Sequence, residues 1–243
     1  MRFEWLRFHP RLAGARSSDR LAASLGALAA ILIVALTSAA LLASLTPIWL
    51  VAPIGASAVL VFAVPASPLA QPWPVIGGNI LSALIGVVLA NTAASHELAA
   101  ALAVGLAIAI MSIARCLHPP GGAAALTAVI GGPAVHALGW SFPFVAVGLN
   151  SIILVAAGIA FHRISGHSYP HRAILASGDL QSIDRRSLDA DDIEAVLAEL
   201  GESFDIGIDD LATIVRAVER RAEARDRLGS KVMLLTPHIR RAA

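Results

Sequence analysis

The sequence predicts an all-α fold, a polytopic bundle of transmembrane helices with a small helical tail, and three observations support this prediction. Hydrophobic residues make up 57% of the 243 residues and charged residues 14%, whereas about a quarter of a typical soluble domain is charged. The charges are also segregated, because Glu97 and Arg115 are the only Asp, Glu, Lys or Arg residues between Leu21 and His162. Finally, several apolar stretches have the length of a membrane span.

Six apolar segments follow one another, and a helix needs about twenty apolar residues to cross a bilayer core. They run from Leu21 to Leu45, Ile48 to Val64, Val75 to Ala93, Leu98 to Leu117, Gly122 to Leu138 and Phe142 to Phe161. The first is too long for the apolar region of a cleaved signal peptide and is better read as a span. The second and fifth are short and broken by Pro and Gly. Each is either a full crossing or a re-entrant element, so both four and six crossings stay open.

Arginines flank the apolar region on both sides, with Arg16 and Arg20 before it and Arg163 and Arg172 after it. Because positive charge is enriched on the cytoplasmic side, we expect both termini in the cytoplasm and an even number of crossings. With six crossings Arg115 also falls on that side, which favours six. We expect a multi-pass protein of the inner membrane of a bacterial cell.

The two halves of the apolar region echo each other. The segment Pro53–Val59 resembles Pro120–Leu126, and Asn79 has a rough counterpart in Asn150. A spacing of roughly three membrane helices makes the second copy inverted relative to the first, as in the 3+3 repeats of secondary transporters. Such repeats place broken helices around a site near the middle of the membrane.

The stretch Arg115–Gly122 is unusual for a membrane segment, since it combines a cation, a histidine, two prolines and two glycines. Proline removes a backbone donor, and hydrocarbon offers no water to replace the lost hydrogen bonds. The stretch therefore has to be buried in protein or to line a polar cavity. Cys116 is the single cysteine, which excludes an internal disulfide and a cysteine-based metal cluster.

Two interpretations of each residue in this stretch stay open. Arg115 either attracts an anion or anchors the cytoplasmic end of its helix. For His118 the choice lies between a substrate contact or proton relay and the capping of carbonyls that the prolines release, and capping is favoured. Backbone N–H groups at Gly121, Gly122 and Gly55 either bind an anion at the start of a broken helix or mark close helix packing.

The candidate site combines the residues discussed above with neutral polar residues of the apolar segments. The candidate substrate-binding residues are Gly55, Ala56, Ser57, Asn79, Arg115, His118, Gly121 and Gly122, and the structural motif is His118, Pro119 and Pro120. Gln71 lies in a rigid, uncharged segment, residues 65–74, which we call the Pro-rich connection and expect to fold back toward the site. We expect no cofactor and no metal site, because the acidic pairs of the tail lack the glycine-centred loop of a calcium site.

The motif His118-Pro119-Pro120 followed by Gly121-Gly122 resembles the signature of the HPP family of integral membrane proteins. The resemblance extends to Ala52–Leu60, to Ser67–Pro72 and to Gly77-Gly78-Asn79 with Ser82-Ala83, and it covers about Arg20 to Arg163. It implies a small polytopic protein thought to be a transporter, and some plant and cyanobacterial relatives are linked to nitrite movement across membranes.

Composition divides the chain into three parts. These are a basic cytosolic N-terminus over residues 1–20, the transmembrane domain over 21–164 and a helical cytosolic tail over 165–243. In the tail, apolar residues recur at helical spacing over Asp189–Leu200 and again after Asp209-Asp210. Its basic end suits anionic lipid, whereas such a short, mixed-charge tail does not suit nucleic acid.

Two functional classes remain in contention. The first is a transporter or channel for a small inorganic anion, with nitrite as the candidate that the family suggests. The second is a membrane sensor or scaffold that acts through its cytosolic helices. We expect no enzyme, because no catalytic motif is present and Glu97 has no intramembrane carboxylate beside it. The expected partners are the lipid bilayer, a small anion and a second copy of the chain.

Overall fold

The structure is a computed structural model, and it describes residues 17–44, 46–92, 95–171, 190–200, 211–222 and 225. These residues form helices and connections without a strand, so the predicted all-α fold is confirmed. The chain divides into two units. One contains the helical bundle up to residue 171, and the other contains the helices of the tail.

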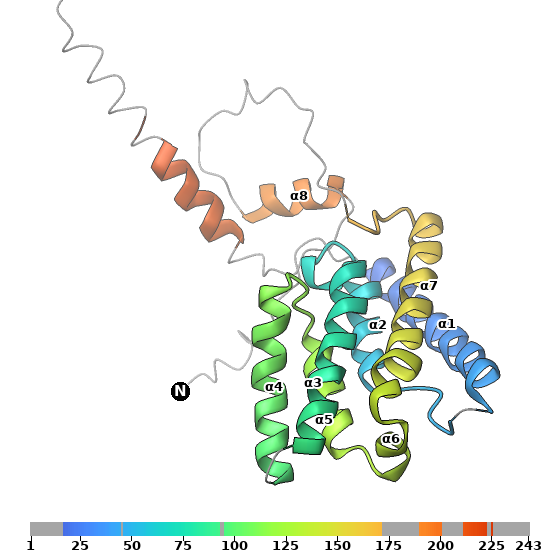
Figure 1. The fold of residues 1–243 in the computed structure, drawn as a ribbon. Coiled ribbons are helices and arrows are strands. Elements are labelled where there is room, and N and C mark those ends of the chain that lie inside the picture. Colours follow the sequence, from blue (N-terminus) through green and yellow to red (C-terminus); the bar gives the residue numbers. More distant parts are fainter. Residues whose placement is uncertain are drawn as a thin grey trace, which may run out of the picture. The chain divides into compact units, whose positions relative to one another are not determined.

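The helices of the bundle follow the six predicted segments (Figure 1). They are α1 (Ser17–Leu42), α2 (Pro53–Ala63), η2 (Pro68–Ala70), η3 (Pro74–Gly78), α3 (Asn79–Thr92), α4 (His96–Ile113), α5 (Pro119–Ile130), α6 (Pro133–Leu138), η4 (Gly139–Ser141), η5 (Pro143–Gly148) and α7 (Leu149–Ser165). Prolines begin α2, α5 and α6, where a missing N–H removes no hydrogen bond. Both η3 and η5 are π-helical, and each continues directly into the α-helix that follows.

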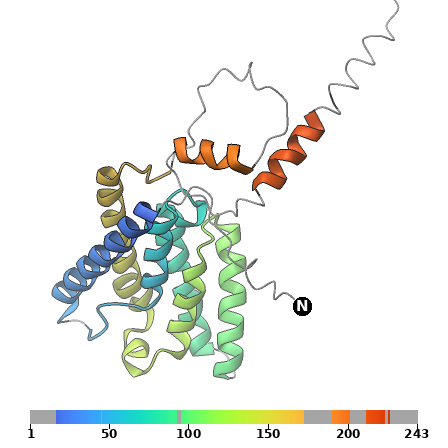
Figure 2. The ribbon, with the colours of Figure 1, turned by 180° about the vertical axis from the view of Figure 1, so that it is seen from behind.

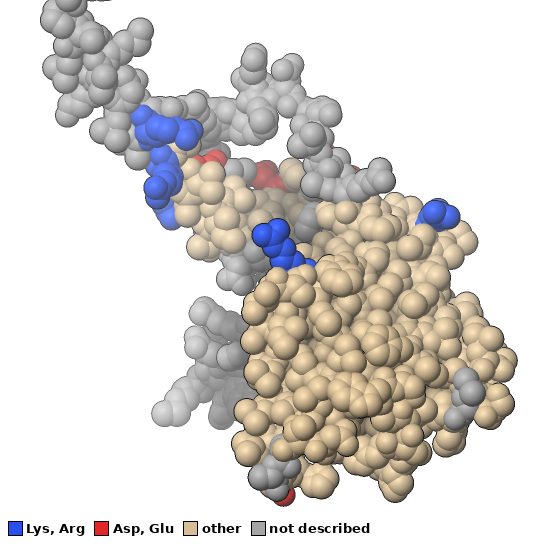
Figure 3. Space-filling model, viewed as in Figure 1, with Lys and Arg blue, Asp and Glu red and all other residues tan. Residues whose placement is uncertain are grey.

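Four helices are long and apolar enough to cross a membrane. They cover Asp19–Leu42, Pro74–Thr92, His96–Ile113 and Pro143–Ser165. The fifth segment is broken, because Pro119–Ile130 and Pro133–Ser141 meet at 92°, and α2 has only 11 residues. By length, the described helices therefore provide four spans, or five when the bent pair counts as one. Figure 3 shows an uncharged surface between Lys and Arg side chains at one end of the bundle and an acidic side chain at the other.

The order of elements repeats between the two halves of the bundle. A long helix is followed by a short helix with proline at its start, and then by a helix that opens with π-helical turns. The third helix of each half packs in the other half: α3 lies against α4 and α5, while α7 lies against α1 and α2 (Figure 1 and Figure 2). This mutual exchange is the arrangement expected of two related units, and it supports the predicted 3+3 repeat.

Helices α3 and α5 approach each other closely through small residues. At Gly86 in α3, an added Cβ would lie 2.3 Å from the carbonyl oxygen of Ala125 in α5. Buried alanines, among them Ala124 and Ala128, face the same contact. Small residues allow membrane helices to pack with their backbones in contact, where dispersion and weak hydrogen bonds hold them together.

The C-terminus of α4 ends in a Schellman motif centred on Arg115. The N–H of Cys116 donates to the carbonyl of Met111 at 2.9 Å, and the N–H of Arg115 donates to that of Ser112 at 3.2 Å. Arg115 has φ = 55°, the left-handed conformation in which this motif usually carries glycine. Met111 and Cys116 are both buried and pack in one cluster, which is the hydrophobic contact that accompanies the motif.

Arg115→Gly is therefore expected to raise the free energy of unfolding by about 0.5–1 kcal/mol, because glycine adopts the left-handed conformation without a steric cost. The measurement is the thermal unfolding midpoint of the purified protein in detergent. A clear fall in the midpoint would show instead that the guanidinium makes a contact worth more than the strain at this position.

The Pro-rich connection folds against the segment that follows α7. The side-chain amide of Gln71 donates to the carbonyl of Ser67 at 2.8 Å, which closes the connection on itself. The hydroxyl of Tyr169 donates to the carbonyl of Ala70 at 2.9 Å, and the N–H of His171 donates to Gln71 Oε1 at 2.8 Å. Burial raises the pKa of Tyr169 far above its ordinary value, so the phenol stays a hydrogen-bond donor.

The tail contains α8 (Ala190–Leu200) and a further helix over residues 211–222. Their residue ranges nearly coincide with those of the two predicted helices. Ile193 and Leu197 are buried, whereas Val196 is exposed, so α8 is amphipathic. Most of the basic N-terminus and much of the tail lie outside the described residues. Most of the predicted basic end of the tail therefore lies outside the described residues, and the sensor or scaffold function through the tail's helices stays a prediction.

Candidate functional site

Three of the predicted site residues come together in the buried interior of the bundle. Ser57 of α2, Asn79 at the start of α3 and His118 before α5 are all fully buried, each with 0% of its surface exposed. Ser57 Oγ lies 2.8 Å from His118 Nε2, and Asn79 Nδ2 donates to Ser57 Oγ at 3.2 Å. We call these residues, together with Ser151 and Ser82 described below, the polar cluster.

The position of His118 follows from the two prolines after it. A residue that precedes proline is pushed out of the helical conformation, and His118 is extended with φ = −140° and ψ = 107°. Proline at the first helical position then begins α5. Two constraints on successive residues thus make His118 the N-cap of α5, which is the physical reason for the His-Pro-Pro sequence.

His118 uses both ring nitrogens. Nδ1 lies 2.9 Å from the carbonyl oxygen of Leu69 in the Pro-rich connection, and a carbonyl can only accept, so Nδ1 carries a proton. His118 lies in the connection between α4 and α5, where burial lowers its pKa to about 4 while the Leu69 hydrogen bond opposes this shift. The ring is therefore neutral near pH 7, and Nε2 accepts from the Ser57 hydroxyl. His118 thus caps a carbonyl, but this is the carbonyl of Leu69 in the Pro-rich connection and not one released by Pro119 and Pro120, as the sequence had suggested.

Asn79 joins three helices from the junction of η3 and α3. Its amide nitrogen donates to Ser57 Oγ on α2 and to Ser151 Oγ on α7, both at 3.2 Å. Ser151 in turn donates to the carbonyl of Val147 at 2.8 Å within its own helix. Because both N–H bonds of the amide end on hydroxyl oxygens, Asn79 fixes the spacing of α2, α3 and α7.

Two buried polar atoms of α3 have no hydrogen-bond partner among the described residues. These are Asn79 Oδ1 and Ser82 Oγ. Buried polar groups in folded proteins are nearly always satisfied, so unsatisfied ones need an explanation such as a ligand or an ordered water. Residues three apart on a helix lie on the same face, so the side chains of Asn79 and Ser82 leave α3 on the same side.

Gly121 of α5 lies next to Ser82. A Cβ at Gly121 would lie 2.7 Å from Ser82 Oγ, 2.9 Å from Met111 Sδ and 3.1 Å from the carbonyl oxygen of Gly78. Glycine at 121 therefore lets α5 approach the serine hydroxyl directly. Gly122 is half-buried and has only Val104 within 4 Å of an added Cβ, so it lies beside this contact and not in it.

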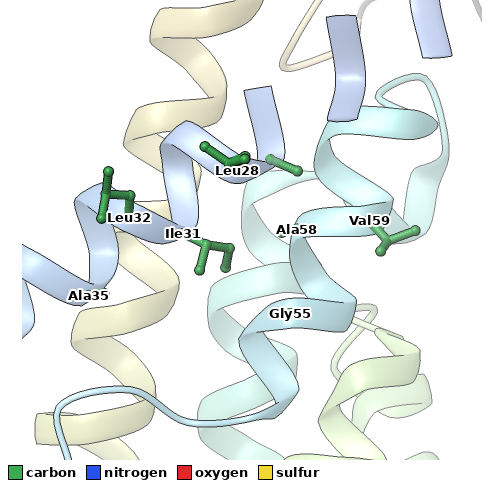
Figure 4. A pocket seen from close by; sticks show the side chains of 8 residues that line it. Leu28, Ile31, Leu32, Ala35, Gly55, Ala58 and Val59 are labelled. Carbon is green, nitrogen blue, oxygen red and sulfur yellow. The ribbon is translucent and has the colours of Figure 1, made fainter. Parts of the chain in front are cut away.

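Gly55, Ala56 and Arg115 are not part of the polar cluster. Gly55 and Ala56 are exposed on α2, and Gly55 lies in an open apolar groove of about 480 Å³ between α1 and α2 (Figure 4). The groove is lined by Ala27, Leu28, Ile31, Leu32, Ala35, Gly55, Ala58 and Val59, whose side chains carry no hydrogen-bonding group. Arg115 is exposed at the end of α4, which suits the predicted anchoring role.

The expectation of bare backbone N–H groups at the two glycine sites is wrong for Gly55 and Gly121. The N–H of Gly55 donates to the carbonyl of Ala52 at 3.0 Å, and that of Gly121 donates to His118 at 2.8 Å. The reason is that the residue before each proline supplies a carbonyl to the first turn. The site is consequently built from side chains of the polar cluster.

Ser82, Ser151 and the Leu69 carbonyl were not among the predicted site residues. Ser82 lies three positions after Asn79, and Ser151 follows Asn150 directly, so helical spacing from the asparagines was the signal that could have found both. A backbone carbonyl leaves no signal in the sequence. Among the described residues, no three His, Cys, Asp or Glu side chains come together as metal ligands would.

Comparison with known proteins now adds to this geometry. The profile described as "HPP, transmembrane region" matches residues 13–170, which include every helix of the bundle and the whole polar cluster. The chain belongs to the HPP family. It is therefore an integral, multi-pass membrane protein that sits in a lipid bilayer.

Two relatives of the HPP chain are named transmembrane proteins of Dictyostelium discoideum, a eukaryote. The first is 41% identical over 126 residues, which are 50% of this chain and 44% of the relative. The second is 49% identical over 87 residues, which are 34% of this chain and 28% of the relative. The chain thus spans less than half the length of these curated relatives. No solved structure matches the chain.

Proposed function

We propose that this HPP-family protein carries a small inorganic anion such as nitrite across its membrane by way of the polar cluster. The observation that supports this most is the enclosure of Ser57, Asn79 and His118, all fully buried, inside a bundle whose other interior side chains are mostly apolar. Polar groups in the interior of a membrane bundle are costly, and they commonly mark the pathway of a substrate.

The placement of the polar cluster also suits transport. It lies where elements of the two halves of the bundle meet, since α2 and η3–α3 come from the first half and α5 and α7 from the second. In repeat transporters a substrate binds at such an interface and is exposed to either side when the halves move. The π-helical starts of the two third helices are short segments of weaker backbone pairing, which are frequent at functional sites.

Enzymatic use of the same residues is less well supported. The Ser57–His118 pair has the 2.8 Å spacing of a nucleophile and its base. However, Ser57 Oγ already accepts a hydrogen bond from Asn79, and the pair is enclosed on all sides. We therefore propose that the pair holds the pathway together and performs no covalent chemistry.

The test is uptake of nitrite by proteoliposomes that contain the purified full chain. We expect uptake above that of protein-free vesicles, and we expect Asn79→Ala to reduce it to the protein-free rate because the amide joins three helices around the site. Asn91→Ala is the matched control, since Asn91 is exposed near the end of α3 and bonds only its own helix at Val87.

Wild-type protein that is folded but carries neither nitrite nor another small anion would contradict the proposed function. Size-exclusion profiles of each variant, recorded in the same detergent before reconstitution, separate loss of transport from loss of fold.

A further inference from the structure

The unsatisfied atoms of the polar cluster define which hydrogen bonds a substrate can make. Asn79 Oδ1 can only accept, and Ser82 Oγ can both donate and accept. The other polar hydrogens of the cluster already have acceptors: His118 Nδ1 donates to Leu69, the Asn79 amide to two serines, and Ser151 to Val147. A substrate therefore meets one free acceptor and one free hydroxyl.

The orientation of the Asn79 amide is supported by its neighbours. With nitrogen toward the serines, Ser57 can donate to His118 Nε2 and Ser151 to the carbonyl of Val147. With oxygen toward the serines, both hydroxyls would turn to Asn79, and His118 Nε2 would lose its donor. The first orientation satisfies more groups, so the atom without a partner is the oxygen.

Asn150 occupies a position comparable to that of Asn79, but its hydrogen bonds are all made within the protein. It lies just after η5, as Asn79 lies just after η3. Its oxygen accepts from the N–H of Val51 at 3.0 Å, and its nitrogen donates to Ser38 Oγ at 2.9 Å and to the Trp49 carbonyl at 3.0 Å. Both ends of the Asn150 amide are satisfied within the protein, whereas the oxygen of Asn79 is not.

Among the residues that the structure describes, no charged side chain faces the polar cluster from the elements around it. The sequences of α2, the Pro-rich connection, η3, α3, α5 and η5 contain no Asp, Glu, Lys, Arg, Cys, His or Tyr. The acidic or basic groups of α4 and α7 lie at helix ends, with His96 and Glu97 in a first turn and His162 and Arg163 in a last turn. Nearer groups are Cys116, which is buried, Tyr169, which bonds Ala70, and Arg115, which is exposed.

An anion would be poorly stabilised in such surroundings. It would lie beside the negative end of the Asn79 amide, without a cation to pair with, in an enclosed environment of low dielectric. A neutral molecule with an O–H group has neither problem, because its hydrogen can bond the free acceptor and its oxygens can accept from the serine.

We propose that the polar cluster binds the neutral, protonated form of a small weak oxyacid, whose O–H donates to Asn79 Oδ1 while another oxygen accepts from the Ser82 hydroxyl. This inference rests on the proposed function and names the species that crosses: anion and proton move together. Gly121 packs directly against this hydroxyl, since a Cβ at Gly121 would lie 2.7 Å from Ser82 Oγ.

The first test compares three anions of similar size in proteoliposomes with equal pH inside and outside. Nitrite and formate are conjugate bases of weak acids, whereas nitrate is the base of a strong acid and stays ionised. The protein-dependent uptake of nitrite and formate, after subtraction of protein-free vesicles, should rise about tenfold for each unit of pH decrease, in step with the neutral fraction. Nitrate uptake should stay at the protein-free rate.

The second test uses Ser82→Ala with Ser112→Ala as its control. Ser82 bonds no described residue, so its replacement should leave the unfolding midpoint unchanged or higher, while protein-dependent nitrite uptake falls by about 3- to 10-fold, the value of one neutral hydrogen bond. Ser112 is exposed and its hydroxyl bonds only the Ile108 carbonyl in its own helix, so Ser112→Ala should change neither quantity.

The outcomes separate the two proposals. Nitrate uptake equal to nitrite uptake, with no dependence on pH, would overturn the neutral-acid inference and leave the transport function standing. So would normal nitrite uptake by Ser82→Ala, which would mean that the hydroxyl contacts water only. Absence of protein-dependent uptake for all three anions would overturn the proposed function itself.

Discussion

Gly86→Ala is expected to force α3 away from α5 and to lower the free energy of unfolding by about 3 kcal/mol, the upper part of the range for overpacked cores. The added methyl carbon would lie 2.3 Å from the carbonyl oxygen of Ala125 and 2.7 Å from the Cβ of Ala128. Neither neighbour can turn away, because one is backbone and the other is attached directly to it. The helices themselves must separate, and the displacement would reach the polar cluster at the start of α3.

Gly105→Ala is the matched control for this prediction. Gly105 lies in the middle of α4, and nothing is found within 4 Å of an added Cβ. Alanine there should raise the free energy of unfolding by about 0.5–1 kcal/mol, since glycine is the less favourable residue in a helix. Thermal unfolding of both variants in the same detergent measures the effect, and equal midpoints would contradict the close packing of α3 on α5.

His118→Ala is expected to abolish nitrite uptake and to destabilise the fold. The change removes the donor to the buried carbonyl of Leu69, and a buried group left unsatisfied costs about 1–3 kcal/mol. The change also removes one acceptor of the Ser57 hydroxyl, which keeps the Pro53 carbonyl at 3.2 Å. It also releases the Pro-rich connection from the start of α5. Uptake by proteoliposomes and the unfolding midpoint should therefore fall together.

Two further variants make the result for His118 specific. His136 is exposed on α6 and bonds the Val129 carbonyl at 3.1 Å, so His136→Ala should change stability by less than about 0.5 kcal/mol and leave uptake unchanged. Ser57→Ala keeps the bond from His118 to Leu69 and should destabilise less than His118→Ala. A fully active, equally stable His118→Ala protein would refute the role assigned to the histidine.

Much of the fold could be predicted because its signals are local. Apolar length indicated the segments that the helices follow, although their exact number is not confirmed, and the prolines at 53 and 119 begin α2 and α5. Helix caps and breaks depend on a few neighbouring residues, which a sequence displays directly. The number of crossings remained open for the same reason: α2 is too short and the pair after Pro119 is bent, and length alone does not place such elements in a bilayer.

The site was harder to predict because its contacts join distant parts of the chain. Ser57 and His118 are 61 residues apart, and Asn79 and Ser151 are 72 apart. Polar residues within or next to apolar segments indicated Ser57, Asn79 and His118, which the structure brings together. The role of a glycine could not be predicted from its residue type, since Gly55 lines an exposed groove whereas Gly121 allows close helix packing. Only tertiary structure distinguishes these uses.

Three consecutive residues of the Pro-rich connection have partners in two distant parts of the chain, the start of α5 and the segment after α7. Leu69 accepts from His118, Ala70 accepts from Tyr169, and Gln71 accepts from the N–H of His171. Adjacent peptide planes cannot shift independently by much, because only two torsions separate them. A displacement of Tyr169 would therefore move the peptide groups of Ala70 and Leu69 and, through the Leu69 hydrogen bond, the imidazole of His118. The position of the segment after α7 is thus coupled to that of the polar cluster.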